Sequence, residues 1–319
     1  MPSSTLDVLA ETYSRVSEAN RQRLTHLTDL LADLSVLGIE VMLLKGADLL
    51  TRVYRTQGTR PLADIDLLVH ECDLPAIDRL LRSRGFTPLI DGNPAYASST
   101  SGLILDLSTS LWYLNEIELT ALWARAERRT FGQTTARVMS MEDLLIHLTA
   151  YAVVHRGHLS AAFLQDLTLL TKKSILDWNR VVGFAREWHL TIPLFHGFSV
   201  ARETKPDMAI PQSVFDHLAP RRWTESCLLW CLRRLVNGVP IPELGHALLL
   251  LTQRPGRRLD RLRATLSPPS AFLAYRYGAG AHAHPLRTRL FRLLHLARSG
   301  TILAFHMSGR LLGLGGGTS

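Results

Sequence analysis

Lysine is scarce in this 319-residue chain, because only four of the 36 Lys and Arg residues are lysines. Cysteine is also rare, and the three that occur suit a reducing compartment rather than a disulfide-stabilised scaffold. Cys227 and Cys231 lie four residues apart, on one face of a predicted helix, but the neighbouring sequence offers no His or Cys pair to complete a metal site. We interpret the two as small core hydrophobes.

Long apolar runs are missing. No run reaches the ~20 residues that span a bilayer, since Arg or His interrupts every candidate. The opening sequence, MPSSTLDVLAETYSRV, lacks the basic segment and apolar core of a signal peptide. Both absences predict an unexported, cytoplasmic protein with no transmembrane segment. With 46% hydrophobic and 20% charged residues, the chain is expected to fold rather than remain disordered.

Positive charge is unevenly distributed along the chain. The net charge is +8, yet residues 251–319 alone contain eleven Arg and one acid, Asp260, a local balance of +10. Apolar residues recur at helical spacing between these arginines, as in RTRLFRLLHLARSG. Three interpretations stay open for this region: a packed helix with a solvated basic face, a surface that contacts RNA phosphates, or a helix on a membrane surface.

Apolar periodicity divides the chain into three parts. Residues 1–139 begin with a helix predicted over 6–37 and continue with strand-like runs and short helices, one of them capped by Asp73. From Ser140, a predicted helix cap, the patterns are helical only. We therefore expect a small α/β domain with an N-terminal helix (1–139), a helical domain (140–250) and a basic helical C-terminal extension (251–319).

The segment LLKGADLLTRVYRTQGTRPLADIDLLV, residues 43–69, places two acids in an apolar strand. Alternation along a strand puts Asp64 and Asp66 on one face and Ile65 on the other. Two carboxylates on one face repel each other unless a cation lies between them. Oxygen ligands favour a hard divalent ion, so the pair predicts a site for Mg²⁺ or Mn²⁺.

A third acid, Asp106, lies in the middle of another predicted strand, LILDLS. If this strand pairs beside the first, Asp64, Asp66 and Asp106 converge on one or two metal ions, an arrangement that suits in-line displacement at phosphorus. The competing interpretation is that Asp64 and Asp66 only end a strand at a solvated edge. The full order of strand, Lys-Gly, helix, D-x-D strand and Asp-bearing strand favours the catalytic interpretation.

Basic residues surround these acids in the sequence. Lys45 and Gly46 lie between a strand and a helix, where a glycine lets a phosphate approach the backbone amides of the helix N-terminus. We expect Lys45 to contact a polyphosphate as a point charge. Arg55 and Arg60 flank the acids and are expected to clamp the same group.

Taken together, LLKGADLL and RPLADIDLLV resemble the polymerase-beta-type nucleotidyltransferase superfamily, and more narrowly its bacterial "nucleotidyltransferase family protein" group. The resemblance continues through SMEDLLIHL, FLQDLTLL and DWNRVVGFAREWHL. It implies an α+β fold, with a small mixed-sheet nucleotidyltransferase domain followed by a helical domain. It also implies an enzyme that moves a nucleoside monophosphate from an NTP such as ATP to an acceptor, with release of pyrophosphate.

The resemblance also implies roles for individual residues. Asp64 and Asp66 would hold the metal ions, and Asp106 would be the third acid, a ligand or general base nearest the acceptor. Gly46 matches the glycine of the superfamily's Gly-Gly or Gly-Ser opening.

Two positions depart from the superfamily pattern. Ala47 stands where Gly or Ser is usual, which removes a hydroxyl contact to phosphate, and Ser108 stands where a histidine is expected. They favour an alternative, a non-catalytic nucleotide- or RNA-binding protein on the same fold. Transfer of the γ-phosphate also stays open, although no G-x-x-x-x-G-K loop is present. The acceptor stays open among a small molecule, a peptide or protein hydroxyl, and an RNA end.

Overall fold

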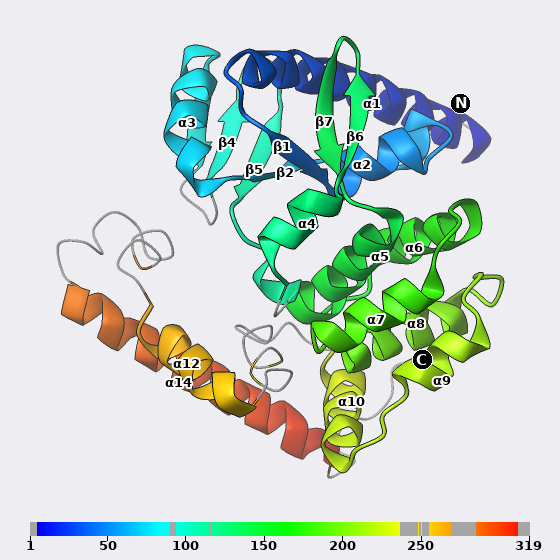
Figure 1. The fold of residues 1–319 in the computed structure, drawn as a ribbon, viewed down its shortest axis with the longest axis vertical. Helices are drawn as coiled ribbons and strands as arrows, with labels where there is room; N and C mark the ends of the chain where they lie inside the picture. The colour runs from blue at the N-terminus through cyan, green and yellow to red at the C-terminus, as the bar shows by residue number, and fades with distance from the viewer. Residues whose placement is uncertain are drawn as a thin grey trace. The chain divides into compact units, whose positions relative to one another are not determined.

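The structure is a computed structural model, and it describes residues 5–89, 94–114, 117–236, 248, 250, 255–268, 273 and 285–311. The chain divides into two compact units. The first comprises Met1–Leu111 and Glu118–Leu144, and the second comprises Trp112–Ile117 and Leu145–Ser319. The first unit contains a sheet and the second is helical (Figure 1).

The first unit is built on a seven-stranded sheet of order β3-β4-β5-β2-β1-β7-β6. The β2–β5 and β1–β7 pairs are parallel, and the other four pairs are antiparallel. The mixed sheet and the helices together confirm the expected α+β class. The strands are β1 (Val41–Leu44), β2 (Ile65–Val69), β3 (Phe86–Leu89), β4 (Ala95–Ser98), β5 (Ile104–Ser108), β6 (Glu127–Phe131) and β7 (Thr134–Val138).

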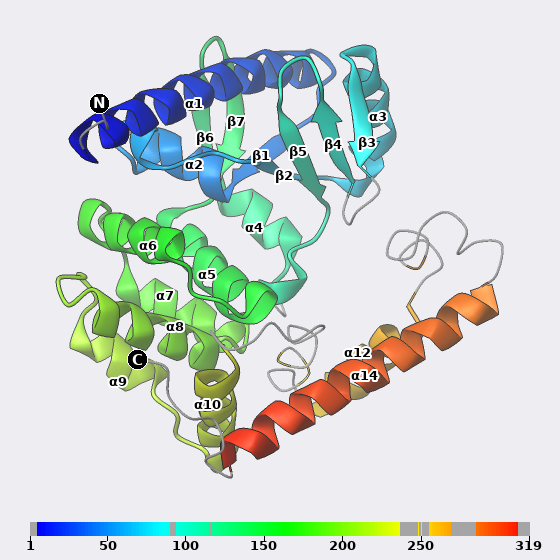
Figure 2. The same cartoon turned by 180° about the vertical axis from the view of Figure 1, so that it is seen from behind.

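Helices pack on this sheet through one hydrophobic core. Leu27, Leu31 and Leu34 of the long first helix share that core with Ile77 and Leu81 of another helix and with residues of β1, β2 and β5. Figure 2 shows this helix running across one face of the sheet. The helices of the first unit are α1 (Thr5–Val36), α2 (Lys45–Arg52), the 3-10 turns η1 (Gln57–Thr59) and η2 (Glu71–Asp73), α3 (Leu74–Ser83) and α4 (Leu119–Arg125).

The two predicted helix caps have different outcomes. The Ser140 hydroxyl accepts the Asp143 backbone N–H at 3.1 Å and caps α5 (Met141–Ala150), as predicted. Asp73 lies at the N-cap position of α3, but its side chain accepts no capping hydrogen bond. Its φ of −87° and ψ of −15° are helical, whereas a capping residue is usually extended. The prediction for Asp73 is therefore wrong.

The second unit contains helices and, among its described residues, no strand. None of the helices that the structure describes is both long and apolar enough to cross a bilayer. After α5 they are the π-helix η4 (Tyr151–Arg156), α6 (Ala161–Lys173), α7 (Trp178–Glu187), α8 (Thr191–Thr204), α9 (Gln212–Leu218), α10 (Trp223–Leu235), α12 (Pro255–Leu266) and α14 (Pro285–Leu311), and a 3-10 turn, η3 (Trp112–Leu114), precedes them.

His196 of α8 is a polar residue inside the core of the second unit. Its ring is buried, and neither ring nitrogen has a hydrogen-bond partner within the described part of the chain. Burial, together with the nearby positive charge of Arg233 on α10, lowers the pKa of His196 from 6.5 to about 4. The folded chain therefore holds this ring neutral at neutral pH.

The stability of His196→Phe relative to the wild type should increase as the pH falls. The unfolded chain protonates this histidine near pH 6.5 but the folded chain only near 4, so the wild type loses stability as the pH drops through this window and the variant does not. Urea unfolding should show a relative gain of about 2 kcal/mol for His196→Phe between pH 7.5 and pH 5. An equal difference between the two proteins at both pH values would contradict this account.

Candidate active site

Two of the three predicted acids lie on neighbouring strands at paired positions. In the parallel β2–β5 pair, Asp66 is the register partner of Asp106. Asp64 precedes β2 directly, two residues before Asp66. Paired residues of adjacent strands direct their side chains to the same face of a sheet. The condition set by the sequence, that the two Asp-bearing strands lie side by side, is thus met.

The three acids differ in exposure but influence one another. Asp66 is 6% exposed, Asp106 is half-buried and Asp64 is exposed. Burial raises the pKa of Asp66 from 3.8 to about 6, and repulsion from Asp64 and Asp106 contributes to the rise, whereas Lys45 opposes it. The β2–β5 register and the position of Asp64 directly before β2 place these three acids near the start of β2.

Lys45 provides the positive charge at this position. Its Nζ donates a hydrogen bond to Asp66 Oδ1 at 2.5 Å. The pair forms because β1 ends at Leu44, the antiparallel register partner of Asp66, and Lys45 follows directly. The Lys45 backbone has φ +46°, a left-handed conformation that costs a residue with a Cβ roughly 1–2 kcal/mol. Contact between Lys45 and phosphate stays a prediction.

Arg60 approaches the first turn of α2 closely. A Cβ added at Gly46 would lie 2.7 Å from Arg60 Nη1 and 2.9 Å from Leu62 Cδ1. A side chain at position 46 would displace the Arg60 guanidinium group or the Leu62 methyl group from its present position. Of the two predicted clamping arginines, the structure places Arg60 beside Gly46, whereas Arg55 lies exposed in the segment between α2 and η1.

Asn20 of α1 holds the segment that leads into β2. Its side chain is fully buried; Nδ2 donates to the carbonyls of Gln57 and Arg60 at 2.6 and 2.7 Å, and Oδ1 accepts the Leu62 N–H at 2.9 Å. Sequence reasoning missed this residue. The available signal was its position, seven residues before Leu27 on the buried stripe of α1, where a polar side chain needs buried partners.

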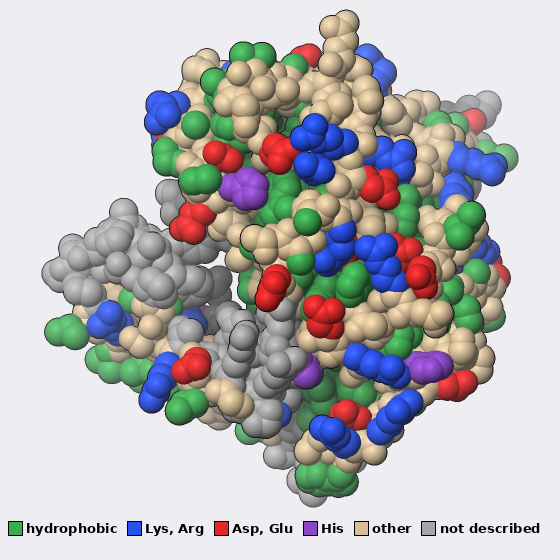
Figure 3. Space-filling model, viewed as in Figure 1, with side chains coloured by type: hydrophobic (Ala, Val, Ile, Leu, Met, Phe, Trp, Pro, Cys, Tyr) green, Lys and Arg blue, Asp and Glu red, His purple; other side chains and the backbone are tan. Residues whose placement is uncertain are grey.

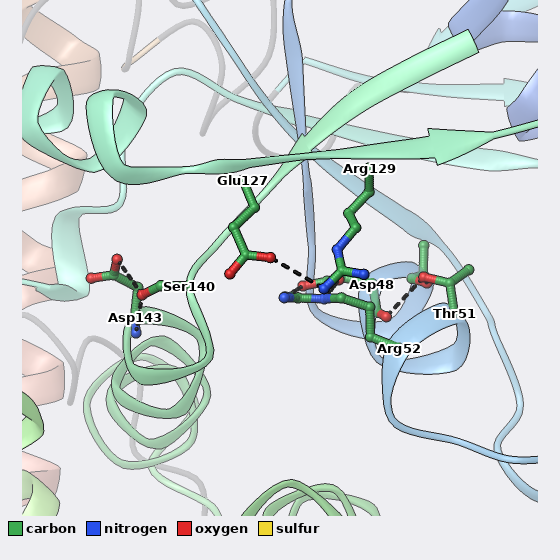
Figure 4. A network of polar contacts seen from close by, with 8 residues as sticks. Asp48, Thr51, Arg52, Glu127, Arg129, Ser140 and Asp143 are labelled. Carbon is green, nitrogen blue, oxygen red and sulfur yellow. Dashed lines mark hydrogen bonds and ion pairs between the residues drawn. The ribbon is translucent and has the colours of Figure 1, made fainter. Parts of the chain in front are cut away.

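A buried ion pair lies inside α2. The Arg52 guanidinium donates hydrogen bonds to both carboxylate oxygens of Asp48, and both side chains are almost fully buried. Burial raises the pKa of Asp48, which Arg52 opposes. Figure 4 shows Glu127 and Arg129 of β6, joined at 3.2 Å, beside this pair. The network supports the helix that begins with Lys45 and Gly46, and sequence reasoning did not single it out.

The donor chemistry of the three acids suits a hard cation, but their arrangement is not that of a preformed metal site. Carboxylate oxygens are the ligands that Mg²⁺ and Mn²⁺ favour. Over the residues described, no group of three or more His, Cys, Asp or Glu side chains is placed to hold a metal ion. One oxygen of Asp66 instead contacts the Lys45 ammonium. The metal site at Asp64, Asp66 and Asp106 stays a prediction.

Residues 1–205 match a nucleotidyltransferase family. The chain belongs to that family, whose description is "Uncharacterised nucleotidyltransferase". The match confirms the resemblance to the nucleotidyltransferase superfamily.

A solved structure of an antigenic nucleotidyltransferase-like protein from Paracoccidioides brasiliensis is also similar, with 15% sequence identity and a TM-score of 0.46. The similarity covers 62% of this chain and 93% of that one. No curated protein matches the sequence.

Replacing Asn20 by Leu should destabilise the chain strongly. Leucine has a similar volume but cannot hydrogen-bond to the Gln57 and Arg60 carbonyls or to the Leu62 N–H. Each of these groups that stays buried without a partner destabilises the folded state by ~1–3 kcal/mol. We expect a loss of at least about 2 kcal/mol in the free energy of urea unfolding. Asn179→Leu, at an exposed position of α7, is the matched control. Equal stability of the two variants would show that Asn20 does not hold this segment.

Proposed function

We propose that this protein is a metal-dependent nucleotidyltransferase that moves a nucleoside monophosphate from an NTP to an acceptor and releases pyrophosphate. The observation that carries the proposal is the cluster of Asp64, Asp66 and Asp106. Asp66 and Asp106 are register partners, and Asp64 and Asp106 both add to the rise that burial causes in the pKa of Asp66. Membership of a nucleotidyltransferase family supports the reaction class.

In this proposal the acids would hold Mg²⁺ or Mn²⁺, which neutralises phosphate charge when bound. A cation at Asp66 would offset both the burial of this carboxyl group and the repulsion from Asp64 and Asp106, which together raise its pKa. Asp106 would act as a ligand or as the general base for the acceptor hydroxyl. The acceptor is a small molecule, a peptide or protein hydroxyl, or an RNA end.

Basic residues would bind the triphosphate. Lys45, which now balances Asp66, would exchange this carboxylate for phosphate once a metal ion supplies the positive charge. Arg60 would contribute a planar guanidinium beside Gly46, and Arg55 would join it from its exposed position. The same acids and bases also fit attack at the γ-phosphate, which the mass of the product distinguishes from nucleotidyl transfer.

A second candidate is a non-catalytic protein that binds nucleotide or RNA on the same fold. Two observations favour it: Ala47 is buried and has no hydroxyl to offer a phosphate, and Lys45 already occupies one oxygen of Asp66. Such a protein should bind nucleotide equally well with and without Asp66.

Nucleotidyl transfer should depend on Asp64 and Asp66. We would incubate the full chain with Mg²⁺ or Mn²⁺, each α-labelled NTP and a cell lysate, and compare the wild type with Asp64→Ala/Asp66→Ala. Loss of the metal-binding carboxylates should reduce label transfer by ~100-fold or more. Asp29→Ala, which removes an exposed acid of α1, should keep wild-type activity.

The failing outcomes are distinct. Absence of transfer with every NTP, from a folded wild-type protein that still binds nucleotide, would favour the binding protein over the enzyme. Equal transfer by the wild type and the double variant would place the active site elsewhere.

A further inference from the structure

Helix α14 buries polar side chains and exposes apolar ones. Thr288, Arg292 and Ser299, at spacings of four and seven, lie on one face and are buried, with Arg292 only 1% exposed. Leucines and phenylalanines of the same helix are exposed, up to 78% for Leu286 and 73% for Phe305. A helix of a water-soluble unit normally shows the opposite pattern. Among the described side chains of α14, the large exposed apolar ones are Leu286, Leu290, Phe291, Leu293, Leu294 and Phe305.

Helix α12 shows the same exposure of leucine. Leu259, Leu262 and Leu266 recur at spacings of three and four, lie on one face and are exposed. The two helices lie side by side in both ribbon views (Figures 1 and 2), and Arg292 Nε of α14 donates to the Thr265 carbonyl of α12 at 2.9 Å. The helix pair therefore presents apolar side chains outward from both members.

Arginines accompany the exposed leucines. Among the side chains of the two helices that the structure describes, five arginines are exposed: Arg258, Arg263, Arg287, Arg289 and Arg298. Asp260 is the single acid among residues 251–319, and it lies 3.9 Å from Arg263. Figure 3 shows hydrophobic and basic side chains side by side on the visible face of the pair. The surface is thus apolar and strongly positive at once.

We propose that the α12–α14 pair binds the surface of an anionic lipid bilayer. Exposed leucine and phenylalanine side chains would enter the boundary between headgroups and acyl chains, while the arginines meet lipid phosphates. The pair would lie on the membrane and not across it, because arginines recur along both helices. No described helix is apolar enough to span a bilayer.

Charge and exposed apolar surface favour anionic lipid over two other binding partners, a second copy of the chain and RNA. A second copy of the chain would bring arginines against arginines, with Asp260 alone to balance them. RNA phosphates would satisfy the arginines but leave the leucines and phenylalanines in water, where their exposure is unfavourable. Anionic lipid satisfies both the charge and the apolar surface.

Vesicle flotation of the full chain tests the proposal. The wild type should float with vesicles of phosphatidylcholine and phosphatidylglycerol, should not float with phosphatidylcholine alone, and should bind less at high salt. Arg287→Ser/Arg289→Ser should weaken binding by about fivefold for each arginine. Leu290→Glu/Leu294→Glu, on one exposed face of α14, should abolish it. Ile175→Glu, at a 99% exposed apolar residue outside the pair, should bind as the wild type does.

Other results would overturn the proposal. The proposal is wrong if the wild type does not float with anionic vesicles. It is also wrong if Leu290→Glu/Leu294→Glu floats as well as the wild type does. If the wild type binds no vesicles but self-associates, and the leucine variant does not self-associate, the surface is an interface between copies. If the wild type binds RNA but not vesicles, the surface binds nucleic acid. Circular dichroism would verify that each variant is folded. None of these measurements uses an NTP, so their outcome is independent of the proposed transferase activity.

Discussion

The ion pair between Lys45 and Asp66 offsets part of the cost of burying a carboxylate beside two other acids. Asp66 is almost fully buried beside two other acids, and its pKa of about 6 against 3.8 corresponds to on the order of 3 kcal/mol that opposes folding at neutral pH. This cost is what remains after the favourable contact with Lys45, which makes that contact from a left-handed backbone position. A buried acid with like-charged neighbours is typical of functional sites, where such costs are retained for activity.

Several interactions position the two residues of that pair. Asn20 fixes the segment before β2 through three hydrogen bonds to backbone groups, and the register of β2 with β1 and β5 then places Asp66 beside both Leu44 and Asp106. On the other side, the Asp48–Arg52 pair stabilises the helix that starts at Lys45. The packing of the first unit thus fixes the positions of the three carboxylates and of Lys45 relative to one another.

Local patterns predicted much of this arrangement. The spacing of Leu27, Leu31 and Leu34 indicated α1, and the apolar runs around Asp66 and Asp106 indicated strands that do pair. Other features depend on contacts between distant residues. The partners of Asn20 lie 37 to 42 residues away, and Lys45 meets a carboxylate 21 residues further along the chain where phosphate was expected. No local pattern encodes those partners.

Carbon-13 NMR titration of the Asp66 carboxyl group, assigned with Asp66→Asn, tests the central claim that the three acids share one site. In the wild type the account predicts a pKa of about 6. In Asp106→Asn, which removes one repelling charge, the Asp66 pKa should be lower, and Mg²⁺ should lower it in the wild type by competing with the proton. A pKa near 3.8 that responds to neither change would contradict the shared site.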